Sequence, residues 1–159
     1  MVERAPGSRV RITILLQGGG PELRGHTGIV YQRRSAEVFL DAVCGFAREE
    51  VKKLGCTPCV AAVGIGRSHV EAGMNMIKAM VKGDLDVQDE WETRITEAIN
   101  QTDTGPLGLG GATTALGSFL HIGPLRASGF RSVTLRLGCC FEPRRATLEM
   151  DPKGNYSVI

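Results

Sequence analysis

The pattern of apolar and polar residues along the chain predicts three strands. A β-branched, apolar run over 10–17 predicts a buried strand, which a run of glycines at 18–20 ends. A second apolar run over 59–65 is short, rich in Val and Ala and close to glycines, so it also predicts a strand. The alternating residues over 132–140 predict the third.

Apolar residues at a spacing of three and four predict three helices. The first spans 35–54, with Ser35 as the expected N-cap and Gly55 as the expected stop. The second spans 68–82, and the third spans 87–100 with a strongly charged outer face.

Two further segments complete the pattern. GPLGLGGATTAL over 105–116 predicts a loop that leads into a helix or turn, and the chain closes with a turn at 152–155. The order strand, helix, strand, helix, helix, loop, strand is typical of an α/β domain. We expect one domain over 1–159, with a mixed or parallel sheet flanked by helices and Gly-rich loops.

Composition narrows the class of protein. A chain of 159 residues is long enough for one domain with a proper core. A net charge of +2 is too small to indicate binding to nucleic acid or to a membrane surface. No apolar run approaches the roughly 20 residues of a membrane span, and no signal-type segment opens the chain. The five cysteines are an odd number, which favours a reducing cytoplasm with thiols available for a metal or for catalysis.

The pair Cys56 and Cys59 in GCTPCVAAVGIGR allows several interpretations. A redox dithiol needs its first Cys at a helix N-terminus, whereas a strand follows here. A zinc site needs a second well-spaced pair, but Cys139 and Cys140 are adjacent and point to opposite faces of a strand. Cys44, in the first helix, is expected to be a small buried hydrophobic residue.

A third interpretation is an iron–sulfur cluster that takes one thiolate from each of several loops. Cys56 comes just before a predicted strand and Cys140 just after one. Periodicity alone does not choose between a cluster and buried thiols.

Two Gly-rich segments have alternative interpretations as anion sites. VGIGRSH over 63–69 resembles a phosphate loop but lacks the third glycine of the dinucleotide fingerprint, so a tight strand-to-helix turn is favoured. GLGG over 108–111 is either a nest of backbone amides for an anion or a plain linker.

Four motifs in one order resemble the alpha subunit of the iron–sulfur (class I) fumarases and L-tartrate dehydratases. They are LLQGGGPE at 15–22, GCTPCVAAVGIG at 55–66, INQTDTGPLGLGGATTAL at 99–116 and CFEPRRA at 140–146. The resemblance covers nearly the whole chain and corresponds to the C-terminal half of that alpha subunit.

The resemblance implies a 4Fe–4S cluster held by three thiolates, with one iron open to substrate. Cys56 and Cys140 match two of the ligands, with Cys139 as the alternative to Cys140. The third ligand lies in an upstream segment that this chain is expected to lack. Gly19 and Gly20 match loop glycines whose backbone approaches the substrate.

One departure from the family pattern concerns the substrate. The family has Pro-Cys-His where this chain has Pro124-Leu125-Arg126. Arg126 is able to bind a carboxylate, but it does not replace a neutral imidazole. Arg126 therefore joins Gly19 and Gly20 as an expected substrate-binding residue.

The leading hypothesis is an alpha-type subunit, or part of one, of a hydro-lyase that adds or removes water on a small dicarboxylate such as fumarate, malate or tartrate. The resemblance implies that the general base and further carboxylate contacts come from a beta subunit, so a hetero- or homo-oligomer is expected. The contrasting hypothesis is a non-catalytic, shortened homologue that serves as a binding or assembly subunit without an intact cluster. A nucleotide-binding domain that uses Gly64 to Gly66 comes third.

Overall fold

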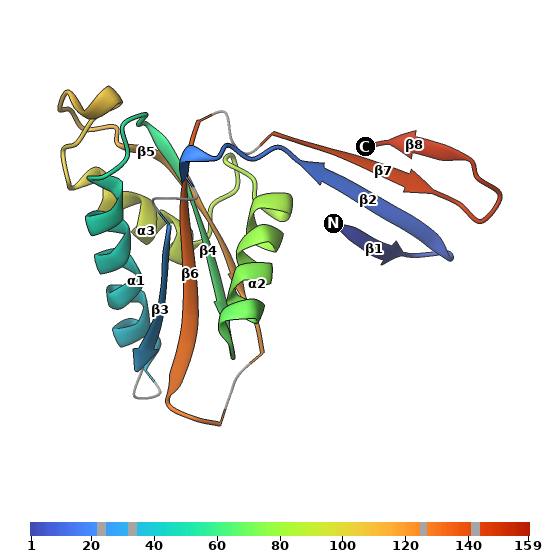
Figure 1. The fold of residues 1–159 in the computed structure, drawn as a ribbon, viewed down its shortest axis with the longest axis horizontal. Coiled ribbons are helices and arrows are strands. Elements are labelled where there is room, and N and C mark those ends of the chain that lie inside the picture. The colour runs from blue at the N-terminus through green and yellow to red at the C-terminus, as the bar shows by residue number, and fades with distance from the viewer. Residues whose placement is uncertain (22–24, 32–34, 125–126, 141–143) are drawn as a thin grey trace.

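Two four-stranded sheets form the computed structural model, which describes residues 1–21, 25–31, 35–124, 127–140 and 144–159. The first, sheet A, is antiparallel and pairs the beginning of the chain with its end. Figure 1 shows sheet A extending away from the helices. Its strands, in order across the sheet, are β1 (Val2–Ala5), β2 (Arg9–Leu15), β7 (Arg145–Met150) and β8 (Tyr156–Val158).

The second sheet, sheet B, is mixed. β4 and β5 run parallel, whereas β6 pairs antiparallel with both β3 and β4. Every residue of β4 is buried, as expected for a central strand covered on both faces. The strand order is β3 (His26–Tyr31), β6 (Phe130–Cys139), β4 (Cys59–Gly66) and β5 (Ala115–Ile122). The predicted α/β class with a mixed sheet is therefore confirmed.

Three helices cover the two faces of sheet B. α1 (Ala36–Val51) and α3 (Glu90–Asn100) pack on one face, and α2 (His69–Lys82) packs on the other (Figure 1). Alternate residues of β4 face the two layers. Cys59, Ala61, Val63 and Ile65 join the larger core under α1 and α3, and Val60 and Ala62 contact the α2 side.

The predicted helix starts at two serines are confirmed. Ser35 accepts a hydrogen bond from the Val38 amide at 3.3 Å, and Ser68 caps α2 through the Glu71 amide at 3.2 Å. α1 stops earlier than predicted, at Val51, so Gly55 is not its stop.

α3 begins later than predicted, because a capping box fixes its first turn. Asp89 accepts from the Glu92 amide at 2.8 Å, and the Glu92 carboxylate accepts from the Asp89 amide at 3.0 Å. Residues 84–87 instead form a turn closed by a single β-bridge.

The prediction that 105–116 leads into a helix or turn is wrong, because β5 begins at Ala115. β1, β3, β7 and β8 were also not predicted. These strands are short or carry polar and glycine residues, and their strand conformation depends on partners distant in sequence.

Candidate functional site

Four cysteines lie at one end of sheet B. Cys59, the first residue of β4, is directly opposite Cys139, the last residue of β6. Cys56 precedes β4 by three residues and Cys140 follows β6 at once, so both lie at this same end. Cys56 and Cys140 are exposed, Cys139 is partly buried and Cys59 is fully buried.

Burial separates the structural thiols from the accessible ones. Burial raises the pKa of Cys59 to about 12, so this thiol stays protonated at neutral pH. Burial also raises the pKa of Cys44, which lies in the core under α1. The interpretation of Cys44 as a small buried hydrophobic residue is confirmed, and the structure shows that Cys59 is buried as well.

A Gly-rich loop holds the backbone beside Cys56. The Thr57 hydroxyl donates to the Gly105 carbonyl and accepts from the Gly108 amide at 3.2 Å. The Leu107 amide donates to the Thr57 carbonyl at 3.0 Å. Gly105 has φ +66°, and a Cβ there would lie 2.0 Å from the Gly110 carbonyl oxygen, so only glycine fits. The loop therefore fixes the Cys56 segment against the sheet end.

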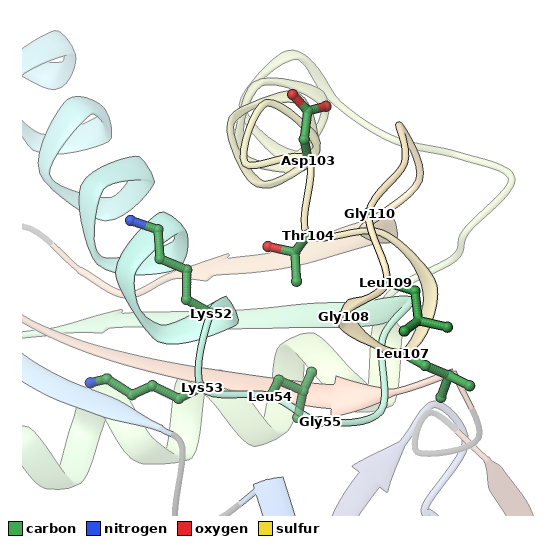
Figure 2. Close-up of a pocket in the computed structure, with 10 residues that line it drawn as sticks. All are labelled: Lys52, Lys53, Leu54, Gly55, Asp103, Thr104, Leu107, Gly108, Leu109 and Gly110. Atoms are coloured by element: carbon green, nitrogen blue, oxygen red, sulfur yellow. The ribbon is translucent and has the colours of Figure 1, made fainter.

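A pocket of about 620 Å³ lies between the end of α1 and this loop. In Figure 2 the side chains of Lys52 and Lys53 point away from the loop. They pair with Glu49 and Glu50 respectively, each at 2.9 Å. The lysines therefore do not make this pocket an anion site.

The amides of Gly108, Leu109 and Gly110 donate hydrogen bonds within the protein. Besides the Gly108 amide, the Leu109 amide donates to Pro106 at 3.1 Å and the Gly110 amide donates to Thr104 at 2.9 Å. The anion-nest interpretation of GLGG is not supported, and the segment instead supports the backbone beside Cys56.

The Gly18–Gly20 loop approaches the same end of sheet B. A guanidinium nitrogen of the buried Arg136, in β6, donates to the Gly18 carbonyl at 2.7 Å. The Leu16 amide donates to the Arg144 carbonyl at 3.0 Å, which ties the loop to the start of β7. Gly19 and Gly20 are exposed, and a Cβ on Gly19 would contact nothing within 4 Å. Their backbone is open to a ligand.

Arg136 was missed by the sequence analysis. The sequence did contain one indication of its role. Arg136 lies within a predicted strand of mostly apolar residues, and a charged side chain is unusual there unless it has buried hydrogen-bond partners.

Arg126, the remaining expected substrate contact, lies outside the described residues. Its described neighbours, Pro124 and Ala127, precede β6, whereas Cys140 follows it. A ten-residue strand spans about 30 Å. The structure therefore gathers Cys56, Cys140 and the Gly19–Gly20 loop at one end of sheet B, and Pro124 and Ala127 lie toward the opposite end.

The glycines of VGIGRSH serve packing. A Cβ on Gly64 would lie 2.0 Å from the Ala72 carbonyl oxygen, and one on Gly66 would lie 2.5 Å from the Ala72 nitrogen. α2 therefore crosses β4 in close contact. Arg67 closes the turn by pairing with Glu71 at 2.8 Å. This is the expected strand-to-helix turn.

The described residues do not supply a full ligand set for a metal ion. Within the described ranges, no three His, Cys, Asp or Glu side chains gather closely enough to hold a metal ion. The sheet end offers two accessible thiols, Cys56 and Cys140, with the partly buried Cys139 beside them.

A family model described as Fumarate hydratase (Fumerase) matches residues 1–149. This chain belongs to the fumarate hydratase family. The matched range contains the sheet end described above and all of the described strands except β8 and Met150, the last residue of β7. Membership of the fumarate hydratase family supports a lyase of the hydro-lyase type. Comparison with curated proteins gives no match for this sequence. In the described part of the chain, no helix is long and apolar enough to cross a membrane.

Proposed function

We propose that this member of the fumarate hydratase family is an alpha-type subunit, or the C-terminal portion of one, of an iron–sulfur hydro-lyase. The reaction is the addition or removal of water across the C=C bond of a small dicarboxylate such as fumarate, malate or tartrate. The observation that supports the proposal best is the meeting of Cys56, Cys140 and the Gly19–Gly20 loop at one end of sheet B.

Cys56 and Cys140 would hold a 4Fe–4S cluster through their thiolates, since both are exposed at the sheet end. Cys140 is preferred over Cys139, because Cys139 is partly buried and lies within β6 opposite Cys59. When bound, the cluster supplies a Lewis acid that polarises the substrate hydroxyl. The third thiolate comes from a segment outside this chain, in line with the two accessible thiols found here.

The chain's own backbone would position the substrate. Amides of the exposed Gly19–Gly20 loop would donate hydrogen bonds to a substrate carboxylate. Arg136 fixes the neighbouring Gly18 carbonyl and so holds the loop in place. The general base that removes the C–H proton is assigned to a beta subunit.

Anaerobic purification of the chain with its beta-type partner tests this function. We expect iron, acid-labile sulfide and the visible thiolate-to-iron absorption, together with hydration of fumarate or dehydration of L-tartrate. Cys56→Ser and Cys140→Ser should each abolish cluster and activity. Cys44→Ser, which replaces a buried thiol under α1, is the control and should retain both.

The non-catalytic alternative rests on the lack of a third donor among the described residues. It predicts that the purified complex holds no iron and that Cys56→Ser and Cys140→Ser change nothing. That result would overturn the hydro-lyase proposal and assign the chain a binding or assembly role.

A further inference from the structure

Buried side-chain polar atoms without a hydrogen-bond partner occur, among the described residues, in one short segment. They are the hydroxyl oxygen of Ser128 and two guanidinium nitrogens of Arg131, Nε and Nη2. All three belong to residues 128–131, which include the start of β6. Buried polar groups in folded proteins are almost always hydrogen-bonded, so a cluster of exceptions indicates a missing ligand.

Arg131 lies at the margin of the larger core. Side chains alternate between the two faces of a strand, so Arg131 shares a face of β6 with the core residues Val133 and Leu135. In the neighbouring strand it is directly opposite Val30, another core residue. Arg131 is only 3% exposed. A charged side chain is therefore withdrawn from water at an apolar face of the sheet.

The described residues compensate this charge poorly. The Arg131 Nη1 donates to the Gly123 carbonyl at 3.4 Å, which is long for a hydrogen bond. Burial lowers the pKa of Arg131, and the charge of Glu71 opposes this only in part. The Glu71 carboxylate is itself held by the Arg67 guanidinium at 2.8, 2.9 and 3.1 Å. Arg131 nevertheless stays protonated, because an arginine does not lose its proton in a protein.

Water alone does not complete the surroundings of Arg131. Ordered water satisfies N–H groups, but it brings no negative charge. A buried charge without a counter-charge strongly destabilises a fold. The unsatisfied nitrogens therefore indicate an anion.

The two unsatisfied nitrogens also indicate the shape of the anion. Nε and Nη2 lie on the same edge of the planar guanidinium, and such an edge forms two parallel hydrogen bonds with a carboxylate or a phosphate. A single-atom anion such as chloride lacks the two oxygens that match these two donors.

The place of Arg131 in the fold agrees with a ligand site. The parallel strands β4 and β5 both end beside it, at Gly66 and Ile122, and α2 begins at the same end of sheet B. Ligands of open α/β sheets bind beyond the carboxyl ends of parallel strands. The N-terminus of α2 adds a positive potential there.

We propose that the Nε–Nη2 edge of Arg131 binds a small oxyanion, a carboxylate or a phosphate, at the end of sheet B away from the cysteines. Arg131 and Cys139 are eight positions apart in β6, a span of about 26 Å, so this site is separate from the cysteine end. The Ser128 hydroxyl is available as a further donor. Because both nitrogens are enclosed, only a small anion fits. Its entry is expected beside Ile122 and Ala127, which are exposed.

Thermal unfolding of the full chain without added iron tests the proposal. The wild type is compared in sodium phosphate, sodium acetate and sodium chloride, all brought to one ionic strength with sodium chloride. We expect Tm to rise in phosphate or acetate by about 3–5 °C for each tenfold increase in anion concentration above the dissociation constant. The anion that gives the larger rise identifies the ligand as a phosphate or a carboxylate.

Arg131→Met is the variant that locates the site, because methionine has a similar length and suits an apolar face. It should lose the anion-dependent rise. In chloride its Tm should equal or exceed that of the wild type, because an uncompensated buried charge is removed. Phosphate also stabilises proteins in general through exclusion from their surface, and this effect should be the same in both proteins.

Arg94→Met is the matched control. Arg94 lies in α3 and is paired with Glu37 and with Asp41, the latter at 2.7 Å. This variant loses an arginine that already has its counter-charges, so it should keep the full anion-dependent rise.

Two results would overturn the proposal. The first is a wild-type Tm that is no higher in phosphate or acetate than in chloride. The second is an equal rise in the wild type and in Arg131→Met, which would place the bound anion elsewhere. If Arg131→Met does not fold, Arg131→Lys decides, because lysine keeps the charge without the two-nitrogen edge and should bind the anion at least tenfold more weakly.

The anion site does not depend on the proposed hydro-lyase activity. Cys56→Ser, which should abolish the cluster, should leave the anion-dependent rise unchanged. Failure of one proposal is therefore distinguishable from failure of the other.

Discussion

Replacing Gly64 by alanine tests how closely α2 packs on β4. The new Cβ would lie 2.0 Å from the Ala72 carbonyl oxygen and 2.1 Å from the Met76 nitrogen. Both contacts are with helix backbone, so no side-chain rotation relieves them and α2 has to move away from the sheet. Overpacking of a core costs about 1–3 kcal/mol, and two backbone clashes place Gly64→Ala at the upper end, at about 3 kcal/mol or more.

The matched control is Gly73→Ala, in α2 itself. A Cβ on Gly73 would contact nothing within 4 Å. Alanine is favoured over glycine inside a helix by about 0.5–1 kcal/mol, so this variant should be more stable than the wild type. The same chemical change is thus expected to have opposite signs at two positions in one helix–strand unit.

Urea unfolding followed by far-UV circular dichroism measures both variants. Gly64→Ala should lower the transition midpoint with little change in its slope, because the surface exposed on unfolding is nearly the same. In thermal unfolding, a loss of about 3 kcal/mol corresponds to a fall of roughly 6–12 °C for a domain of this size. A Gly64→Ala variant within 1 kcal/mol of the wild type would refute the close-packing argument.

Three further predictions concern the candidate site and its surroundings. Thr57→Val should cost about 1 kcal/mol in urea unfolding, because the buried Gly105 carbonyl loses its hydroxyl donor and keeps the Gly108 amide, at 3.2 Å, as a donor. In a thiol-titration assay at pH 8, Cys59 should react only after denaturation, since it is buried and its pKa is raised to about 12. Rapid labelling of Cys59 in the native protein, located by mass spectrometry, would contradict this prediction. Glu71 should titrate in an NMR experiment with a pKa of about 2, and Arg67→Ala should return it toward 4.5. Because the pKa of Glu71 is lower in the folded state, the stability that this pair contributes is present above about pH 4.5 and is lost as the pH falls toward 2. A Glu71 pKa that stays the same in Arg67→Ala would contradict the assignment of the shift to Arg67.

Elements with strong local signals were predictable from sequence. β4 is an uninterrupted run of small apolar residues, and α1 follows a serine N-cap and has helical periodicity. β3 and β5 lacked such signals. β3 contains His and Gly, and β5 follows directly on a Gly-rich loop, so their strand conformation depends on pairing with β6 and β4.

The candidate site was predictable as a set of residues and not as an arrangement. The positions of Cys56 before one strand and Cys140 after another were evident from the pattern. Their meeting at one end of sheet B depends on the antiparallel pairing of β4 with β6. This pairing joins segments about 80 residues apart, and no local sequence pattern indicates it. The contact between Arg136 and Gly18 joins residues 118 positions apart, and the sequence pattern did not predict it either.

The pairing of β2 with β7 has a consequence for the order of folding. The hydroxyl contact between Thr13 and Thr147 joins residues 134 positions apart, whereas the helices of the sheet B layer and the β4–β5 crossover form over much shorter separations. Long-range pairing is slow because loop closure precedes any gain from contacts. During synthesis β2, paired only with β1, therefore waits for its second partner until β7 has left the ribosome, and Val10, Ile12 and Ile14 stay open to other chains throughout. A chaperone that binds short apolar strands should accordingly engage nascent chains through residues 9–15 and release them once 145–150 are made.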